Sequence, residues 1–66
     1  MILHINGEAR ELAAATTVHE MVAELSLPAQ MLLIEHNGVA LRRSEWGAAA
    51  IADGDRIEIL RVAAGG

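Results

Sequence analysis

The residues best placed to do chemistry stand at the end of the chain. After Val62 the sequence reads Ala63, Ala64, Gly65 and Gly66, four residues with almost no side chain. Residues without bulk can thread a narrow channel, and glycine allows close approach of the backbone. A terminal carboxylate has a pKa near about 3.5, so at neutral pH it is an anion and a poor electrophile. To react with a nucleophile, Gly66 must first be activated, for instance as an acyl-adenylate. The alternative is a frayed end without function.

The rest of the chain offers few groups for catalysis or metal binding. It has no cysteine, which excludes disulfides, thiolate metal sites and cysteine nucleophiles. His4, His19 and His36 show no metal-ligand spacing. Asp53 and Asp55 flank a glycine, but the fuller calcium-loop pattern is missing and a turn is favoured. No phosphate-binding glycine motif and no nucleophile with a neighbouring base occur. We therefore expect no bound metal or cofactor, and a protein that is not an enzyme by itself.

Composition limits the class of protein. Sixty-six residues make one small domain, and 53% hydrophobic residues with a net charge of −4 are enough apolar content to fold. The acidic balance argues against a nucleic-acid partner, because a phosphate backbone selects for a basic face. No apolar run approaches the roughly 18 residues of a membrane span, and no signal peptide is evident. We expect a cytoplasmic protein without a membrane partner.

The elements that must position the tail begin with a predicted hairpin. The first five residues alternate between apolar and polar side chains, which indicates a half-buried strand. Asn6-Gly7 is the strongest short hairpin signal, because both residues tolerate positive φ. A weaker second strand is predicted over 8–12, with Ala9 and Leu12 directed toward the core.

A short helix follows the hairpin. The segment TTVHEMVAEL has its apolar residues three and four positions apart, which is typical of one helix face. Thr17 and Glu20 have the spacing of a capping box. Pro28 stops the helix, since the residue before a proline avoids helical geometry. The predicted helix runs from about Val18 to Ser26.

The second half of the chain predicts the remaining strands. Residues 31–36 are apolar on both faces until Glu35, which indicates a strand near the centre of the sheet. The other predicted elements are a turn at Asn37-Gly38, a short strand over 39–41, a helical turn from Ser44 that carries Trp46 inward, a turn over 53–55 and a final strand over 56–62. One helix must then cover one face of a mixed sheet of four to five strands, which is a two-layer α+β domain. If the first and last strands pair in the centre, the chain leaves the sheet toward solvent.

The final strand also carries a candidate docking surface. Glu58, Leu60 and Val62 share one strand face, and Glu58 marks that face as solvent-exposed. Two apolar residues that lead directly into the tail fit a partner-docking patch, which Met31 and Leu33 extend. Scattered exposed apolar residues are also normal, so an ordinary surface is the alternative.

Several motifs together resemble a known family. "TVHEM" opens the helix, Trp46 is followed by "IADGD", and the chain ends in "AGG". This combination resembles the ThiS family, the sulfur carriers of bacterial thiamine biosynthesis, over essentially all 66 residues. The final Gly-Gly alone is less specific, because ubiquitin-like proteins and molybdopterin carriers share it. Arg42 departs from the pattern, since a proline is expected there.

The resemblance implies a fold and a cycle of chemistry. It implies a β-grasp (ubiquitin-like) domain over 1–62 and a flexible tail over 63–66. In that family a ThiF-like enzyme uses ATP and magnesium to adenylate the terminal glycine, here Gly66. A sulfur donor system then forms a thiocarboxylate, and a ThiG-like thiazole synthase receives the sulfur. Gly65 and Gly66 match the family directly, whereas docking through Leu60 and Val62 is inferred from apolarity alone.

Three alternatives stay open at this point. The same chemistry can serve molybdopterin synthesis or another sulfuration pathway. A ubiquitin-like modifier would instead form isopeptide bonds to target proteins. A plain binding module would use its sheet surface and leave the tail idle.

Overall fold

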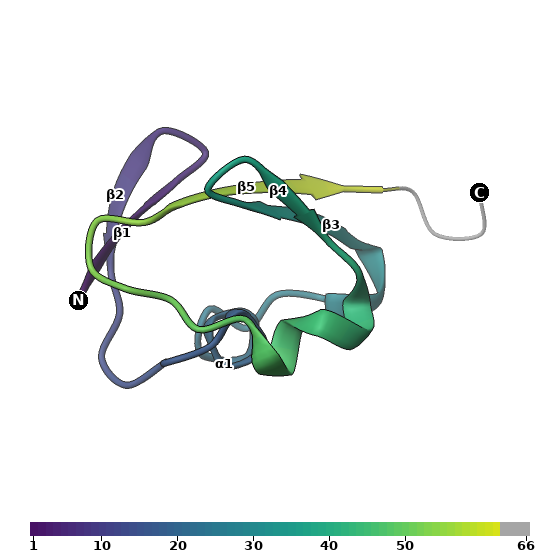
Figure 1. Cartoon of the computed structure of the whole chain (residues 1–66), viewed down its shortest axis with the longest axis horizontal. Coiled ribbons are helices and arrows are strands. Elements are labelled where there is room, and N and C mark those ends of the chain that lie inside the picture. Colours follow the sequence, from purple (N-terminus) through teal and green to yellow (C-terminus); the bar gives the residue numbers. More distant parts are fainter. Residues whose placement is uncertain (63–66) are drawn as a thin grey trace.

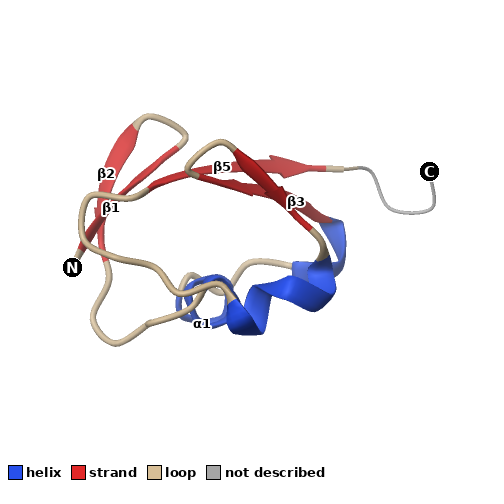
Figure 2. Ribbon diagram, in the orientation of Figure 1, coloured by secondary structure: helices blue, strands red, loops and turns tan. Residues whose placement is uncertain are grey.

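The computed structural model describes residues 1–62 and arranges them as a sheet with helices on one side (Figures 1 and 2). The elements in chain order are β1 (Ile2–Ile5), β2 (Glu8–Glu11), α1 (Val18–Glu24), the 3₁₀ helix η1 (Ala29–Met31), β3 (Leu32–His36), β4 (Val39–Leu41), the 3₁₀ helix η2 (Arg43–Ala48) and β5 (Arg56–Arg61). The predicted α+β class, with one main helix on one face of a mixed sheet, is confirmed.

The strand order places the last strand in the middle of the sheet. Within residues 1–62 the order is β2-β1-β5-β3-β4. β1 and β5 run parallel, whereas β2 pairs with β1, and β3 with both β4 and β5, in antiparallel fashion. The first and last strands therefore do lie side by side in the centre. In Figure 1, β5 runs from the β1 side toward the end of the molecule away from the N-terminus.

Both predicted hairpin turns form at the Asn-Gly pairs. Asn6 and Asn37 have φ of 51° and 49°, and the glycine after each has φ of 83° and 85°. These are left-handed conformations, which suit the two central positions of a hairpin turn. Each asparagine also reaches β5: Asn6 exchanges two hydrogen bonds with the backbone of Ile59, and Asn37 accepts one from the Arg56 N–H. The turns therefore also fix the central strand.

The helix begins as predicted and ends earlier. It ends at Glu24 because Leu25 is the C-cap and Ser26 has a φ of 56°, which is incompatible with continuing the helix. Only half of the predicted capping box forms. The Thr17 hydroxyl accepts from the Glu20 N–H at 3.1 Å, but the Glu20 carboxylate accepts from the N–H and hydroxyl of Thr16, one residue before the cap.

A second carboxylate of the helix holds the loop that precedes it. Glu24 accepts hydrogen bonds from the backbone N–H groups of Ala13, Ala14 and Ala15, at 2.6, 3.1 and 3.0 Å. These bonds, led by the one from Ala13, lower the pKa of Glu24 below its ordinary value. One side chain thus satisfies three consecutive donors in a segment that has no strand or helix partner for them.

Replacement of Glu24 by glutamine is expected to loosen this loop. An amide has one acceptor oxygen, so the three N–H groups lose at least part of their charged acceptor. We expect a lower melting temperature and faster amide hydrogen exchange at residues 13–15. The pKa of Glu24 is lower in the folded state, so its stabilisation is present above the unfolded pKa and is lost as the pH falls through the folded value.

The control is Glu8→Gln, on the exposed edge strand β2. Equal exchange rates at residues 13–15 in the E24Q variant and the wild type would contradict this role.

The core lies between the sheet and the helical layer. Its buried side chains are Leu3, Ile5, Leu12, Ala15, Val18, Met21, Val22, Leu32, Ile34, Trp46, Ile51 and Ile57. Leu12 is buried as predicted, but the prediction for Ala9 is wrong. Ala9 shares its face with His4 on the side of the sheet away from the core, and β2 is an edge strand whose four residues are all exposed.

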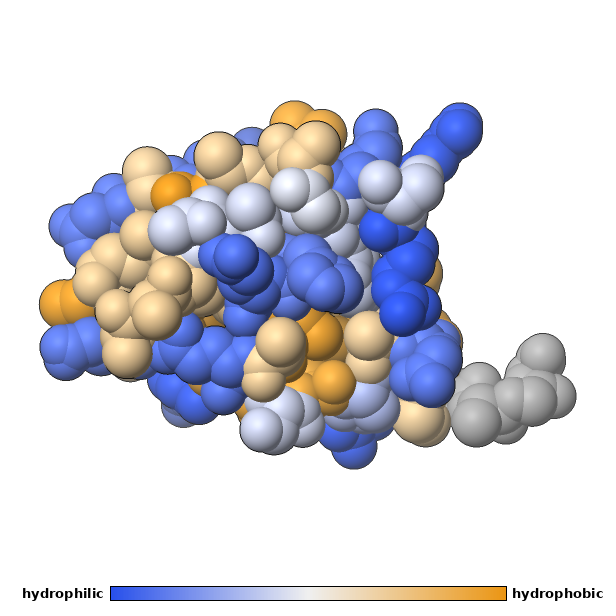
Figure 3. Space-filling view, turned by 90° about the horizontal axis from the view of Figure 1, so that it is seen from below, coloured by the Kyte–Doolittle hydropathy of each residue, from blue (hydrophilic) through white to orange (hydrophobic). Residues whose placement is uncertain are grey.

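Trp46 closes the core from the helical side. It lies in η2, which begins at Arg43, one residue before the expected start, and its side chain is 1% exposed. The guanidinium of Arg43 lies 5.1 Å from the centre of the indole ring, a cation–π distance. Figure 3 shows this side of the molecule, where hydrophobic areas are interrupted by hydrophilic residues. Trp46 is thus a core residue, as predicted.

Candidate functional site

Of the candidate site, the structure describes the end of the central strand, β5, and the residue that follows it. β5 ends at Arg61, and the backbone N–H of Val62 donates to the Met31 carbonyl at 2.7 Å. Val62 is therefore still tied to the rest of the fold. The predicted reacting and threading residues, Gly66, Gly65, Ala64 and Ala63, lie outside the described residues. Their roles, and the division of the chain at residue 62, stay predictions.

Two of the four predicted docking residues meet across neighbouring strands. Leu33 on β3 lies directly opposite Leu60 on β5, and their side chains are 56% and 62% exposed. Val62 is exposed to a lesser degree, at 36%. Met31 departs from the prediction, because it is the last residue of η1 rather than part of the strand. Within residues 1–62, Met31 is joined to this surface by the hydrogen bond that its carbonyl accepts from the Val62 N–H.

This surface is an open groove on the side of the sheet away from α1. The groove has a volume of about 420 Å³, and its lining includes Leu33, Glu35, Ala40, Glu58 and Leu60. Ala40, from β4, was not part of the sequence prediction. Ala40 lies directly opposite Glu35 in the antiparallel β3–β4 pair, so the two side chains are on the same face of the sheet. We name this surface, defined by those five residues, the β3–β5 groove.

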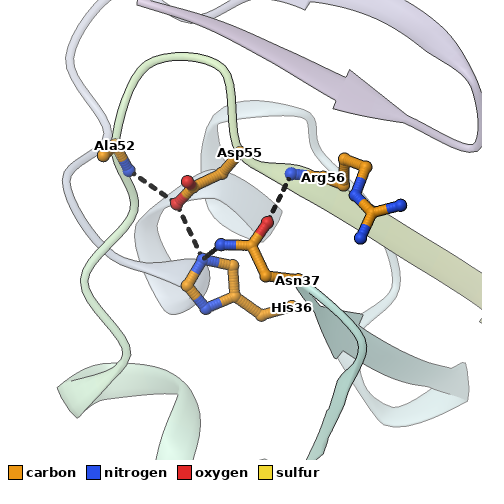
Figure 4. A network of polar contacts seen from close by, with 5 residues as sticks. All are labelled: His36, Asn37, Ala52, Asp55 and Arg56. Atoms are coloured by element: carbon orange, nitrogen blue, oxygen red, sulfur yellow. Dashed lines mark hydrogen bonds and ion pairs between the residues drawn. The ribbon is translucent and has the colours of Figure 1, made fainter.

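A polar network fixes the start of the same strand (Figure 4). His36 Nε2 lies 2.8 Å from Asp55 Oδ2, and the Ala52 N–H donates to that same oxygen at 2.8 Å. Asn37 Nδ2 lies 3.4 Å from His36 Nε2, and the Asn37 oxygen accepts from the Arg56 N–H. The network joins the β3–β4 turn to the turn before β5. These groups act on the backbone of the turns, so we assign them a structural role.

The charge of Asp55 depends on its partners. The hydrogen bond from His36 is the largest cause that lowers its pKa below the ordinary 3.8, followed by the Ala52 N–H. Both favour the ionised carboxylate in the folded state. Hence Asp55 contributes stability above the unfolded pKa, and this contribution is lost as the pH falls through the lower folded value.

Asp55→Asn is expected to lower the free energy of unfolding by about 1 kcal/mol at neutral pH. A hydrogen bond to a charged group contributes about 1.5–3 kcal/mol, and partial solvent exposure reduces that figure here. Urea denaturation from pH 7 to pH 2.5 measures the change. The difference between D55N and the wild type should shrink below about pH 3.8, where the unfolded carboxyl becomes protonated. Glu11→Gln, on the edge strand, is the control. A difference that stays constant over this range contradicts the assigned role.

The described residues show no metal centre and no membrane span. Within residues 1–62 no three His, Asp or Glu side chains come together as ligands for a metal ion. His4 and His19 are exposed and lie in separate elements, and His36 contacts Asp55. Among the described helices, none is both long and apolar enough to cross a membrane.

The arrangement defines the class of protein. A mixed sheet in the order β2-β1-β5-β3-β4, with one main helix packed on one face, is the β-grasp arrangement. The crystal structure of the thiamine biosynthesis protein ThiS from Geobacter metallireducens has the same fold, with a TM-score of 0.83, 32% identity and complete coverage of both chains. The solution structure of a thiamine biosynthesis protein from the same organism gives a TM-score of 0.78 and is covered over 88% of its length.

Sequence comparison identifies the family. The ThiS family model matches residues 3–66, and the chain belongs to this family. It is 32% identical to the sulfur carrier protein ThiS of Escherichia coli K12 over the full length of both proteins. It is also 35% identical to a thiazole synthase of Paramagnetospirillum magneticum and 29% identical to one of Magnetococcus marinus. The chain spans about a fifth of the length of these two thiazole synthases, at 20% of each. The resemblance noted from the motifs is confirmed.

Proposed function

We propose that the chain is a sulfur carrier in thiamine biosynthesis, and that Gly66 is its reacting residue. In this proposal the Gly66 carboxylate is adenylated, becomes a thiocarboxylate, and donates its sulfur for thiazole formation. The observation that carries the proposal is the family match, which extends through the Gly-Gly end of the chain. Full-length similarity to a protein named as a sulfur carrier supports the same function.

The chemistry follows from the state of the carboxylate. At neutral pH it is an anion, which a nucleophile does not attack readily. A carboxylate oxygen first attacks the α-phosphorus of ATP, and pyrophosphate leaves. A sulfur nucleophile at the oxidation level of hydrosulfide then attacks the acyl carbon, and AMP leaves. The net change at Gly66 is one oxygen replaced by one sulfur, and the thiocarboxylate is itself a nucleophile.

The proposed cycle needs three partners. A ThiF-like enzyme supplies the ATP and magnesium chemistry, since the chain shows no phosphate-binding motif of its own. A separate sulfur donor is required, because a chain without cysteine cannot hold sulfur as its own persulfide. A ThiG-like thiazole synthase receives the sulfur, and the matches within two thiazole synthases support this choice. The chain itself acts as a co-substrate rather than as an enzyme.

Genetic complementation tests the pathway. An Escherichia coli strain that lacks its own ThiS should grow without added thiazole when it expresses this chain. A variant with Gly66 deleted should not support growth, which controls for nonspecific rescue. If the chain is present as folded protein and no growth occurs, the assignment to thiamine biosynthesis is contradicted. Rescue of a strain that lacks its molybdopterin carrier would instead indicate that pathway.

A further inference from the structure

The β3–β5 groove contains two carboxylates that face each other. Glu35 on β3 and Glu58 on β5 are directly opposite in the antiparallel register, and both are exposed. Directly opposed residues have Cβ atoms about 4.5–5.5 Å apart, and like charges in such a pair are destabilising. The sheet thus carries an unfavourable pair of like charges across β3 and β5. A neutral pair at the same position would make the sheet more stable.

No basic side chain among residues 1–62 forms an ion pair with either of these carboxylates. Within residues 1–62 the contact of ion-pair length is the one between His36 and Asp55, and neither Glu35 nor Glu58 makes such a contact. Arg56 lies on the same face of β5, two residues from Glu58, but forms no ion pair with it. The carboxylates are therefore available to a group from outside these residues.

The neighbours of the pair are apolar. Two positions along the register, and therefore on the same face of the sheet, Leu33 faces Leu60, and both side chains are more than half exposed. Ala40 lies beside Glu35 on the next strand. The groove therefore joins an apolar half to an acidic half. A matching surface carries a cation next to an apolar side chain, and charge complementarity of this kind gives specificity and fast association.

We propose that the β3–β5 groove binds the adenylating enzyme through an arginine that sits between Glu35 and Glu58, with apolar side chains of the enzyme on Leu33 and Leu60. Arginine fits because its planar guanidinium has five donors and can bridge two carboxylates, and its alkyl stem packs on apolar surface. This inference rests on the proposed function, because the same strand leads directly to the residues that the enzyme would modify. Docking through the groove would fix β5 while the end of the chain enters the enzyme.

The test measures binding and stability on the same variants. The variants are Glu35→Gln, Glu58→Gln and the double variant, and the matched control is the Glu8→Gln, Glu11→Gln double variant on β2. Binding to the adenylating enzyme from the same genome is measured by calorimetry at two salt concentrations. We expect each groove variant to raise Kd about tenfold, and to reduce the salt dependence of Kd.

The melting temperature of the double groove variant should be higher than that of the wild type, because the like-charge pair is gone. A purely structural role would not give weaker binding together with higher thermal stability.

ATP–pyrophosphate exchange separates the two proposals. If the wild type supports exchange and the groove variants bind as tightly as the wild type, this inference is overturned and the proposed function is unaffected. If the control variant loses as much affinity as the groove variants, net charge rather than the groove is responsible, and the inference is again overturned. If the wild type gives no exchange with the enzyme, the proposed function fails and this inference fails with it.

Discussion

Addition of a single alanine after Gly66 is expected to abolish sulfur loading while leaving the fold unchanged. The added residue converts the Gly66 carboxylate into an amide and moves the terminal carboxylate by about 3.5 Å along the chain. A misplacement of 1 Å can already cost about 10²-fold in rate, so we expect adenylation to fall by at least about that factor. The measurement is ATP–pyrophosphate exchange with the adenylating enzyme.

A second variant serves as the control for this prediction. Ala64→Gly keeps the length of the chain and the small size of the segment, so its exchange rate should stay close to that of the wild type. Melting temperatures of both variants should match the wild type, because residues 1–62 contain the whole of the described core. Full exchange activity in the extended chain would contradict a role for Gly66 and favour a binding module with an idle tail.

Trp46→Ala is expected to unfold a large part of the protein population. The indole is 1% exposed, and removal of a buried aromatic side chain typically costs about 3–5 kcal/mol. A domain of this length has a total stability of roughly 3–10 kcal/mol, at about 0.05–0.15 kcal/mol per residue. The expected loss is therefore comparable with the total free energy of unfolding. Urea denaturation followed by circular dichroism measures it.

Trp46→Phe is the informative companion variant. The indole N–H is buried and has no hydrogen-bond partner among residues 1–62, so phenylalanine removes no such bond. We expect a loss of about 1–2 kcal/mol, from reduced packing volume alone. The surface variant His19→Ala should stay close to the wild type. Equal losses for the alanine and phenylalanine variants would show that packing of the ring is not the main contribution of Trp46.

Local signals predicted most of the secondary structure. Both Asn-Gly pairs form hairpin turns with positive φ, and Thr17 caps the helix at the predicted residue. These features depend on a few neighbouring residues, which is why the sequence reveals them. The exposure of Ala9 depends instead on its pairing with His4, which puts it on the face of the sheet away from the core. The position of Met31 depends on a 3₁₀ turn that carries no strong local signal.

Long-range pairing explains what was missed at the candidate site. The alternation within each strand predicts that Leu33, Leu60 and Glu58 share one surface. The direct facing of Glu58 and Glu35 depends on the register between strands that are more than twenty residues apart. The contact between His36 and Asp55 has the same origin, since it joins two turns that are distant in sequence. The proposal that Gly66 reacts rests instead on residue types and on the lack of other reactive groups in the sequence.

The mass of the loaded protein tests the central claim most directly. Purified chain is incubated with the adenylating enzyme, ATP, magnesium and a sulfur donor, and intact-protein mass spectrometry follows the product. The predicted result is a gain equal to one oxygen-to-sulfur exchange, located at Gly66 by fragmentation and absent without ATP. An unchanged mass, although the enzyme hydrolyses ATP and loads its known carrier under the same conditions, would contradict the claim that Gly66 carries sulfur.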